Sequence, residues 1–309
     1  MSETLYDVLI IGGGPAGLTA GLYASRAKLK TLLVERMILG GQVMTTTKVE
    51  NYPGFPGGID GPDLMMRFQE HCQEFGLETV SGEVTGLQDL GPCKEVTVDG
   101  QRYRTRSVII ATGAEPKKLD VPGEGGFVGR GVSYCSPCAG AFFRNVEVAI
   151  AGGGDTAAEE ALFLSRFASK VYLIHRRDQL RATKVLQERV AAHERIEPVW
   201  NSVVTGVLGD NSGVTALALS DPQGGNCRTL EVAGLFVAIG VVPKAHFLAG
   251  ILDLNAEGYI LTDGECRTSM PGVFAAGDVR KKILKQIATA VGDGAVAAIV
   301  AEKYLDELG

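Results

Sequence analysis

The chain has 309 residues, of which 45% are hydrophobic and 21% are charged, a composition that excludes a disordered or fibrous protein. Thirty Lys and Arg against 36 Asp and Glu give a net charge of −6 without a basic arm, so we expect no nucleic-acid partner. Domains are usually about 100–200 residues long, which predicts two here. Glycine, with 41 residues, is well above its usual ~7%, and this excess indicates tight turns or backbone that approaches a ligand.

The sequence gives no sign of a membrane or secreted protein. No apolar run approaches the roughly 18–20 residues that span a bilayer, and the start, MSET, lacks the features of a signal peptide. Six cysteines are too few for a disulfide framework. We therefore expect a cytoplasmic protein with mostly reduced thiols and no membrane partner.

An internal repeat organises the chain. Residues 8–36, VLIIGGGPAGLTAGLYASRAKLKTLLVER, match residues 148–176, VAIAGGGDTAAEEALFLSRFASKVYLIHR, without a gap. Each copy reads as a buried strand, a glycine turn, an amphipathic helix and a second strand, which together form a βαβ unit. Two crossovers of one sheet are the alternative. The wide spacing and a full phosphate-binding turn in each copy favour two separate nucleotide-binding units.

Strands that end in glycine lie at 108–114 and 235–243, and Pro116 and Pro243 at their ends suggest linkers. The predicted fold is α/β, with two Rossmann-like dinucleotide-binding domains, the second inserted into the first. Residues 1–114 and 244–309 form the first domain, and residues 115–243 form the second. From Gln286 onward the chain is predicted to be a helix with an apolar stripe.

The first glycine turn, GGGPAG at 12–17, satisfies the pattern G-x-G-x-x-G through Gly12, Gly14 and Gly17. In that pattern the first glycine permits the turn, the second lets backbone N–H groups approach a pyrophosphate, and the third lets the helix pack on the strand. Glu35 follows at the end of the next strand, where a carboxylate binds an unphosphorylated ribose. An ordinary surface carboxylate is the alternative for Glu35.

The second turn, GGGDTA at 152–157, uses Gly152, Gly154 and Ala157 for the same geometry. The position equivalent to Glu35 is His175, and three arginines follow it: Arg176, Arg177 and Arg181. Guanidinium groups match phosphate oxygens, so this site is predicted to bind NADPH rather than NADH. The alternative is a solvated basic patch at a strand end.

Two further segments, ATG at 111–113 and VFAAGDV at 273–279, fit the first domain. Gly277 and Asp278 would place a backbone N–H and a carboxylate near a diphosphate and a polyol, which indicates FAD in this domain. An aspartate at a strand end can also be a helix cap.

Cys135 and Cys138 form a C-x-x-C motif. A zinc site would need two further ligands, but the other four cysteines are isolated and the four histidines show no ligand spacing, so we predict no metal. An inert pair is the other alternative. In a chain with a hydride donor and a flavin, the disulfide of such a pair can take two electrons from NADPH through FAD and become a dithiol.

Taken together, these motifs closely resemble low-molecular-weight thioredoxin reductase over essentially the whole chain. They are GGGPAG, GGQ (40–42), ENYPGF (50–55), ATG, GRGVSYCSPC (129–138), GGGDTAAEEA (152–161), HRRDQLRA (175–182) and GVFAAGDV (272–279). The resemblance implies a homodimer that reduces thioredoxin, with a second domain that rotates relative to the first.

The resemblance also assigns residues. Cys138 would face the flavin, and Cys135 would attack the partner disulfide. The residues implied to bind FAD are Gly12, Gly14, Gly17, Glu35, Gly41, Gln42, Asn51, Gly113, Gly277, Asp278 and Gln286. Those implied to bind NADPH are Gly154, Asp155, Thr156, His175, Arg176, Arg177 and Arg181.

The chain departs from the family pattern after the second cysteine, where Ala139 replaces the usual aspartate, a candidate proton donor. Water or another carboxylate, such as Glu159, would then supply the proton, and we favour water. Near the C-terminus, Lys285-Gln286-Ile287 replaces Arg-Gln-Ala. Alternative functions are reduction of another acceptor, such as a peroxidase component or a glutaredoxin-like protein, or oxidation of small dithiols.

Overall fold

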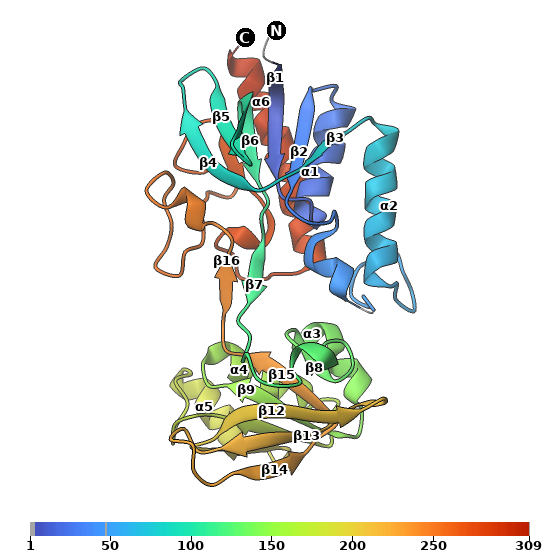
Figure 1. Ribbon diagram of the computed structural model, residues 1–309, viewed down its shortest axis with the longest axis vertical. Helices are drawn as coiled ribbons and strands as arrows, with labels where there is room; N and C mark the ends of the chain where they lie inside the picture. The colour runs from blue at the N-terminus through green and yellow to red at the C-terminus, as the bar shows by residue number, and fades with distance from the viewer. Residues whose placement is uncertain (1–3, 47, 309) are drawn as a thin grey trace. The chain divides into compact units, whose positions relative to one another are not determined.

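The structure is a computed structural model that describes residues 4–46 and 48–308 (Figure 1). Part of the MSET segment therefore lies outside the described residues. The chain divides into two compact units, Met1–Glu115 with Val242–Gly309, and Pro116–Val241. The predicted boundaries, after 114 and 243, differ by one or two residues. The division falls inside β7 (Ala114–Pro116) and β16 (Val241–Pro243), which pair with each other as a two-stranded sheet.

The first unit is built on a seven-stranded mixed sheet with the order β3-β2-β1-β6-β5-β4, in which β17 also pairs with β6. The strands are β1 (Leu5–Ile11), β2 (Thr31–Glu35), β3 (Glu78–Ser81), β4 (Val84–Asp89), β5 (Lys94–Val98), β6 (Gln101–Ile110) and β17 (Val273–Ala275). The pairs around β1 are parallel, whereas β4, β5 and β6 form an antiparallel meander.

The helices of the first unit are α1 (Pro15–Arg26), α2 (Gly61–Glu74) and α6 (Ile287–Leu308), with short 3-10 helices η1 (Gly41–Thr45), η4 (His246–Leu248) and η5 (Gly277–Val279). The helix predicted from Gln286 thus begins one residue later. The α1 and α6 helices pack against each other (Figure 1), and small residues such as Ala20 and Ala297 line their buried faces.

Both faces of this sheet are buried, as expected of parallel strands between layers. Val8 and Ile10 of β1 face the layer of α1 and α6, while Leu9 and Ile11 belong to a second core on the opposite face. All four are at most 3% exposed. This uninterrupted burial explains why the first strand reads as a continuous apolar run.

The second unit has a five-stranded parallel sheet with the order β11-β10-β9-β15-β8 and a separate antiparallel sheet, β12-β13-β14. Its strands are β8 (Val132–Ser133), β9 (Glu147–Gly152), β10 (Lys170–Ile174), β11 (Ile196–Val199), β12 (Val203–Asp210), β13 (Gly213–Ser220), β14 (Arg228–Glu231) and β15 (Gly234–Ala238).

Helices cover one face of the parallel sheet in the second unit, and the β12–β14 sheet covers the other. The helices are α3 (Ser136–Ala139), α4 (Asp155–Leu164) and α5 (Lys184–Ala191), with the 3-10 helices η2 (Gly125–Phe127) and η3 (Gly140–Phe143). Each repeat copy thus folds as strand, helix and strand, β1-α1-β2 and β9-α4-β10. The predicted α/β fold with two Rossmann-like units, one inserted into the other, is confirmed.

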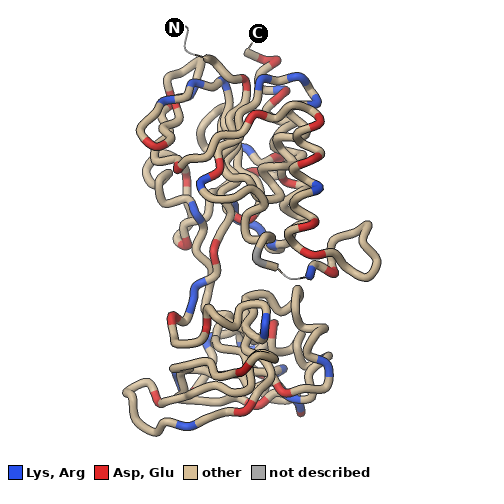
Figure 2. Tube along the Cα trace, turned by 45° about the vertical axis from the view of Figure 1, so that its right-hand side comes forward, with Lys and Arg blue, Asp and Glu red and all other residues tan. Residues whose placement is uncertain are grey.

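Charge is distributed over both units. Figure 2 shows Lys and Arg interspersed with Asp and Glu along the trace. Among the described residues, no helix is both long and apolar enough to cross a membrane.

Candidate active site

The first glycine turn, between β1 and α1, is shaped by contacts that exclude side chains. Gly12 has φ +106°, and a Cβ there would collide with the Ala111 carbonyl. A Cβ on Gly17 would collide with the carbonyl of Gly12. Beside Gly14, in contrast, the space is open. The fold itself therefore requires Gly12 and Gly17, whereas Gly14 leaves room for a ligand at the N-terminus of α1, where backbone N–H groups favour an anion.

Glu35 lies at the end of β2, beside this turn. One of its carboxylate oxygens accepts a hydrogen bond from the Gly13 N–H at 2.7 Å, and the other accepts one from the Met37 N–H at 3.0 Å. These two bonds fix the carboxylate against Gly13, in the middle of the GGG sequence of the turn. Its predicted contact with a ribose stays a prediction.

Other predicted FAD residues come together from distant parts of the chain. Asn51 donates a hydrogen bond to the Gln286 side chain at 2.8 Å, which joins residues 235 positions apart. Gln42, on η1, donates to the Ala114 carbonyl. Gly41 lies beside the backbone of Gly14, and Gly113 has φ +72° and accepts a hydrogen bond from the Lys244 N–H at 3.0 Å.

Asp278 lies on η5 with one carboxylate oxygen, Oδ1, buried and without a hydrogen-bond partner. The ammonium of Lys282 is 3.5 Å from that oxygen. Burial raises the pKa of Asp278, while the nearby charges of Lys282 and Lys285 oppose that rise. Gly277, next to it, has φ +76° and donates its N–H to Asp293 at 3.0 Å. Apart from this ion pair the buried oxygen accepts no hydrogen bond, and a ligand hydroxyl group would supply one.

The second glycine turn, between β9 and α4, repeats the contacts of the first. A Cβ on Gly152 would collide with Ala157 and the Ala238 carbonyl, and one on Gly153 would collide with the His175 ring. The space beside Gly154 is open. In both turns, therefore, the second glycine of the G-x-G pattern, Gly14 or Gly154, is the one with open space beside it.

Asp155 and Thr156 begin α4 directly after this turn, and both are exposed. The Asp155 carboxylate accepts a hydrogen bond from the Thr183 N–H at 2.6 Å. This bond ties the start of α4 to the segment that follows the arginines.

His175 follows β10 and is buried, and its Nε2 atom has no hydrogen-bond partner. Burial lowers the pKa of His175, and the charges of Arg181 and Arg177 lower it further. Arg176, Arg177 and Arg181 are exposed. The Arg181 N–H donates to the Gly153 carbonyl at 2.7 Å, so the basic segment folds back over the glycine turn.

Cys135 and Cys138 are joined by a disulfide, with 5.3 Å between their Cα atoms. Cys135 is the N-cap residue of α3, and its N–H donates to the Ser133 hydroxyl at 3.2 Å. Burial raises the pKa of the unpaired Cys72 to about 12 and that of Cys266 to about 11, so these two thiols stay protonated at neutral pH. Within residues 4–46 and 48–308, no three His, Cys, Asp or Glu side chains gather as metal ligands.

Comparison with known proteins places the chain in a family. The model of the pyridine nucleotide-disulphide oxidoreductases matches residues 6–294. Thioredoxin reductases of Listeria innocua and Bacillus subtilis are 49% and 46% identical to the chain, each over 99% of it and 96% of their own length. The crystal structure of thioredoxin reductase from Streptococcus pyogenes superposes with a TM-score of 0.95 at 43% identity, covering 99% of this chain and all of that one.

The chain belongs to the low-molecular-weight thioredoxin reductases of this oxidoreductase family. These enzymes use FAD and NADPH. The residues present fit both groups. The open space at Gly14, the unpartnered oxygen of Asp278 and the Asn51–Gln286 pair suit FAD in the first unit. The open space at Gly154 and the unpartnered nitrogen of His175, close to Arg177 and Arg181, suit NADPH in the second.

Because Ala139 follows the second cysteine of this thioredoxin reductase, a proton donor for the cysteines has to come from elsewhere, and nearby carboxylates are candidates. Glu159, the candidate from the sequence, is exposed. Its neighbour Glu160 is partly buried and accepts a hydrogen bond from the Ser136 hydroxyl at 2.8 Å. Burial raises the pKa of Glu160 to about 7, although hydrogen bonds from Ser136 favour the charged form. Sequence reasoning missed this residue. The available signal was helical spacing, since 160 is three residues after the buried Ala157.

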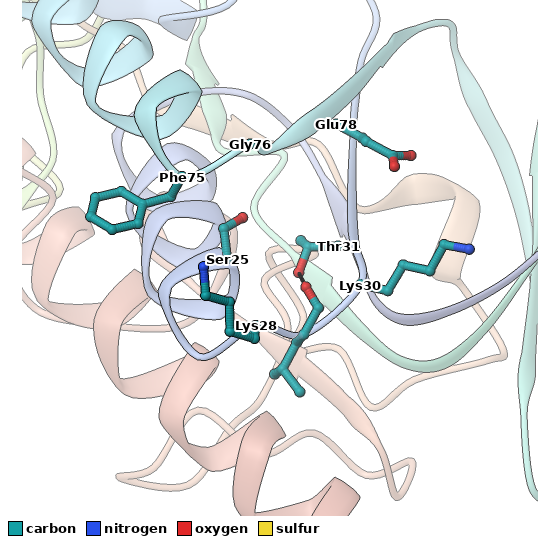
Figure 3. A pocket seen from close by; sticks show the side chains of 8 residues that line it. Ser25, Lys28, Lys30, Thr31, Phe75, Gly76 and Glu78 are labelled. Carbon is teal, nitrogen blue, oxygen red and sulfur yellow. Dashed lines mark hydrogen bonds between the residues drawn. The ribbon is translucent and has the colours of Figure 1, made fainter.

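The hollow in Figure 3 is distinct from these sites. Its lining residues, which include Ser25, Lys28 and Phe75, lie at the end of α1 and the end of α2. Because the glycine turn is at the beginning of α1, this hollow is at the opposite end of the helix from the proposed FAD position in this thioredoxin reductase.

Proposed function

We propose that the chain passes two electrons from NADPH through FAD to the Cys135–Cys138 disulfide, and from the reduced pair to oxidised thioredoxin. The observation that carries this proposal is the Cys135–Cys138 disulfide in a chain that also has two dinucleotide turns with open space at Gly14 and Gly154. Thioredoxin as the acceptor is supported by the relatives' names. A Mycobacterium leprae relative, 47% identical, is named a bifunctional thioredoxin reductase/thioredoxin, and the chain covers 67% of it.

In this proposal each unit holds one dinucleotide. When bound, FAD would supply the redox chemistry that converts hydride transfer from NADPH into reduction of a disulfide. The proposed FAD ligands are Gly12, Gly14, Gly17, Glu35, Gly41, Gln42, Asn51, Gly113, Gly277, Asp278 and Gln286. The proposed NADPH ligands are Gly154, Asp155, Thr156, His175, Arg176, Arg177 and Arg181. The Glu35 carboxylate suits a ribose without a 2′-phosphate, whereas the guanidinium groups after His175 suit a ribose that carries one. This difference supports FAD in the first unit and NADPH in the second.

The two cysteines have different roles. Cys138 faces the flavin, and the Cys135 thiolate attacks the disulfide of thioredoxin. That attack forms a mixed disulfide, which Cys138 then resolves, so that the Cys135–Cys138 bond re-forms and thioredoxin leaves with two thiols. The enzyme works as a homodimer in the cytoplasm, in keeping with the family resemblance.

The test measures NADPH oxidation by the purified flavoprotein with and without oxidised thioredoxin. We expect turnover that requires thioredoxin and is lost in Cys135→Ser and Cys138→Ser, while a single equivalent of NADPH still reduces the flavin in both. Cys135→Ser leaves a Cys138 thiolate beside oxidised flavin and gives a long-wavelength charge-transfer band, which Cys138→Ser lacks. Turnover with a glutaredoxin-like protein or a peroxidase component, but not with thioredoxin, would assign another acceptor. A band in the opposite variant would reverse the roles of the cysteines.

A further inference from the structure

The redox pair is linked to a carboxyl group through Ser136, one of the two residues that separate the cysteines. Ser136 directly follows Cys135, begins α3 and is fully buried. Its hydroxyl donates to Glu160 Oε2 on α4 at 2.8 Å. The α3 and α4 helices pack against each other within the second unit, so this contact does not depend on how the two units are placed.

From this geometry we infer that Glu160, acting through Ser136, holds the proton that accompanies reduction of the Cys135–Cys138 disulfide, in place of the acid missing at position 139. The inference rests on the proposed function and names a positioning residue for it. Two electrons, delivered from NADPH through FAD, break the S–S bond. Glu160 gives up its proton, so that one sulfur becomes a thiol and the other a thiolate. The proton that comes with the hydride of NADPH is released to water when the flavin is oxidised again, and water protonates the Glu160 carboxylate, so the proton count balances.

The charges around Glu160 permit this role. Glu159, next to it on α4, is the charged neighbour that acts on it, and it favours the protonated form. On the elements packed against α4, Lys170 of β10 pairs with Glu197, and Glu147 of β9 accepts the Tyr172 hydroxyl. The charged residues of α5 are exposed, namely Lys184, Glu188 and Arg189. The α3 helix carries no charged residue, so a reduced cysteine is the titrating group there.

Burial raises the pKa of Glu160 to about 7, which sets the direction of the pH dependence. Below that pH the carboxyl group holds a proton and can give it up, and as the pH rises through 7 the proton is lost. Its benefit to disulfide reduction therefore declines on the alkaline side. A carboxylate that stays near the reduced pair also disfavours a thiolate, which raises the pKa of the cysteine thiols.

The first measurement needs no turnover. The full-length protein is reduced with dithiothreitol, and the rate of alkylation by iodoacetamide is followed between pH 5 and 10 on the tryptic peptide 131–144, which contains Cys135 and Cys138. We expect Glu160→Gln to move the pH at which the thiolate appears down by about one unit. The amide of Gln can still accept the Ser136 hydrogen bond. The matched control, Glu159→Gln, changes the adjacent exposed carboxylate, which acts on Glu160 only through its charge, and should shift the profile much less than Glu160→Gln.

The second measurement is rapid mixing of the holoenzyme with NADPH, followed by the rate of disulfide reduction. General-acid help is typically a ~10²–10⁴ effect, so Glu160→Gln should slow this step tenfold or more at pH 6, with the difference closing above pH 8. Ser136→Ala, which keeps the carboxyl group but removes the link, should show the same loss. Ala139→Asp should restore the rate in the Glu160→Gln background.

Two results would overturn the inference. One is an alkylation profile and a reduction rate of Glu160→Gln that match the wild type. The other is an equal effect of Glu159→Gln, which would indicate a general effect of charge. If the enzyme does not reduce thioredoxin at all, the proposed function fails, but the alkylation profile still reports whether Glu160 is coupled to the cysteines. The two failures are therefore distinguishable.

Discussion

In the proposed NADPH site, His175 and the arginines that follow it would contribute differently to binding a phosphate, because the ring is buried and the arginines are exposed. The His175 ring is held against Gly153, and its unpartnered Nε2 is buried. Arg176 and Arg177 are exposed, so binding must order their side chains before it gains their charge-assisted hydrogen bonds. Under the proposed function, the ring would therefore position the ligand, and the arginines would supply most of the discrimination between a phosphate and a hydroxyl group.

The arginine pair gives a prediction about cofactor choice. Charge-assisted hydrogen bonds contribute about 1.5–3 kcal/mol each, so Arg176→Ala with Arg177→Ala should weaken NADPH binding by several kcal/mol. The affinity for NADH, which lacks the 2′-phosphate, should change little. Titration of the flavoprotein with each dinucleotide gives both dissociation constants. An equal loss for both would show that these arginines do not bind the 2′-phosphate.

Glu159 and Glu160 show what the sequence could and could not specify at a single residue. The repeat predicts that both residues lie on a helix. Adjacent residues on a helix point about 100° apart, so one faces solvent while the other faces α3. Which of the two glutamates faces α3 depends on how α3 packs on α4. That packing brings together segments more than 20 residues apart, and no local pattern encodes it.

At the scale of elements, the two βαβ units repeat each other down to single backbone contacts. In each motif, a backbone carbonyl at the end of the neighbouring parallel strand lies against the first glycine. This carbonyl belongs to Ala111, directly after β6, in the first motif and to Ala238, at the end of β15, in the second. In both, the middle glycine caps the helix with open space beside it, and its φ lies at −76° for Gly14 and −94° for Gly154. These values suit any residue, so the fold alone does not demand glycine at either position.

This contrast predicts that the middle glycines can be substituted without loss of the fold. Gly14→Ala should reduce FAD retention, and Gly154→Ala should reduce NADPH affinity, each by about tenfold or more (1.4 kcal/mol), because the added methyl group occupies the space meant for the pyrophosphate. Flavin content and NADPH titration measure the two effects.

Each variant serves as the control for the other, since Gly154→Ala should keep its flavin and Gly14→Ala should still bind NADP+. Gly153→Ala is a further control, expected to destabilise the fold because its methyl group would collide with the His175 ring. Loss of both dinucleotides in either alanine variant would mean that the turn itself had been damaged.

The repeat predicted the strands β1 and β2 in one sheet and β9 and β10 in the other. It could not predict the β12–β14 sheet, which lies outside it. The Val204 and Val207 side chains of β12 pack on Ala149 and Val237 of the parallel sheet. The register of such strands is set by the surface they cover as well as by their own alternation. The α4 helix also ends at Leu164, two positions before the equivalent of the end of α1, at Arg26.

On the scale of the whole molecule, the hydrophobic side chains form separate cores. Three clusters lie in the first unit and two in the second, and each cluster of described residues stays within one unit. The chain passes between the units only at β7 and β16. Units with their own cores and few covalent connections are expected to unfold as separate cooperative blocks.

This arrangement predicts that damage to a core of one unit will not spread to the other unit. Phe236 on β15 is fully buried beside Phe143, with ring centroids 5.2 Å apart. Phe274 on β17 is 2% exposed and packs on Tyr304 in the first unit. Replacing a buried phenylalanine by alanine typically costs about 3–5 kcal/mol. Phe236→Ala should therefore speed hydrogen exchange in peptides of residues 116–241 alone, and Phe274→Ala in peptides of the other unit.

Cofactor binding gives a second test of whether the two units unfold independently. A ligand that binds only the folded form stabilises it by about 2.7 kcal/mol at a hundredfold excess over its dissociation constant. NADP+ should therefore slow exchange in residues 116–241 of both variants, whereas FAD retention should fall only in Phe274→Ala. If Phe236→Ala accelerates exchange equally throughout the chain and releases FAD, the two units unfold as one block. The stability of the inserted unit would then depend on the first unit, and the two units would be coupled through β7 and β16.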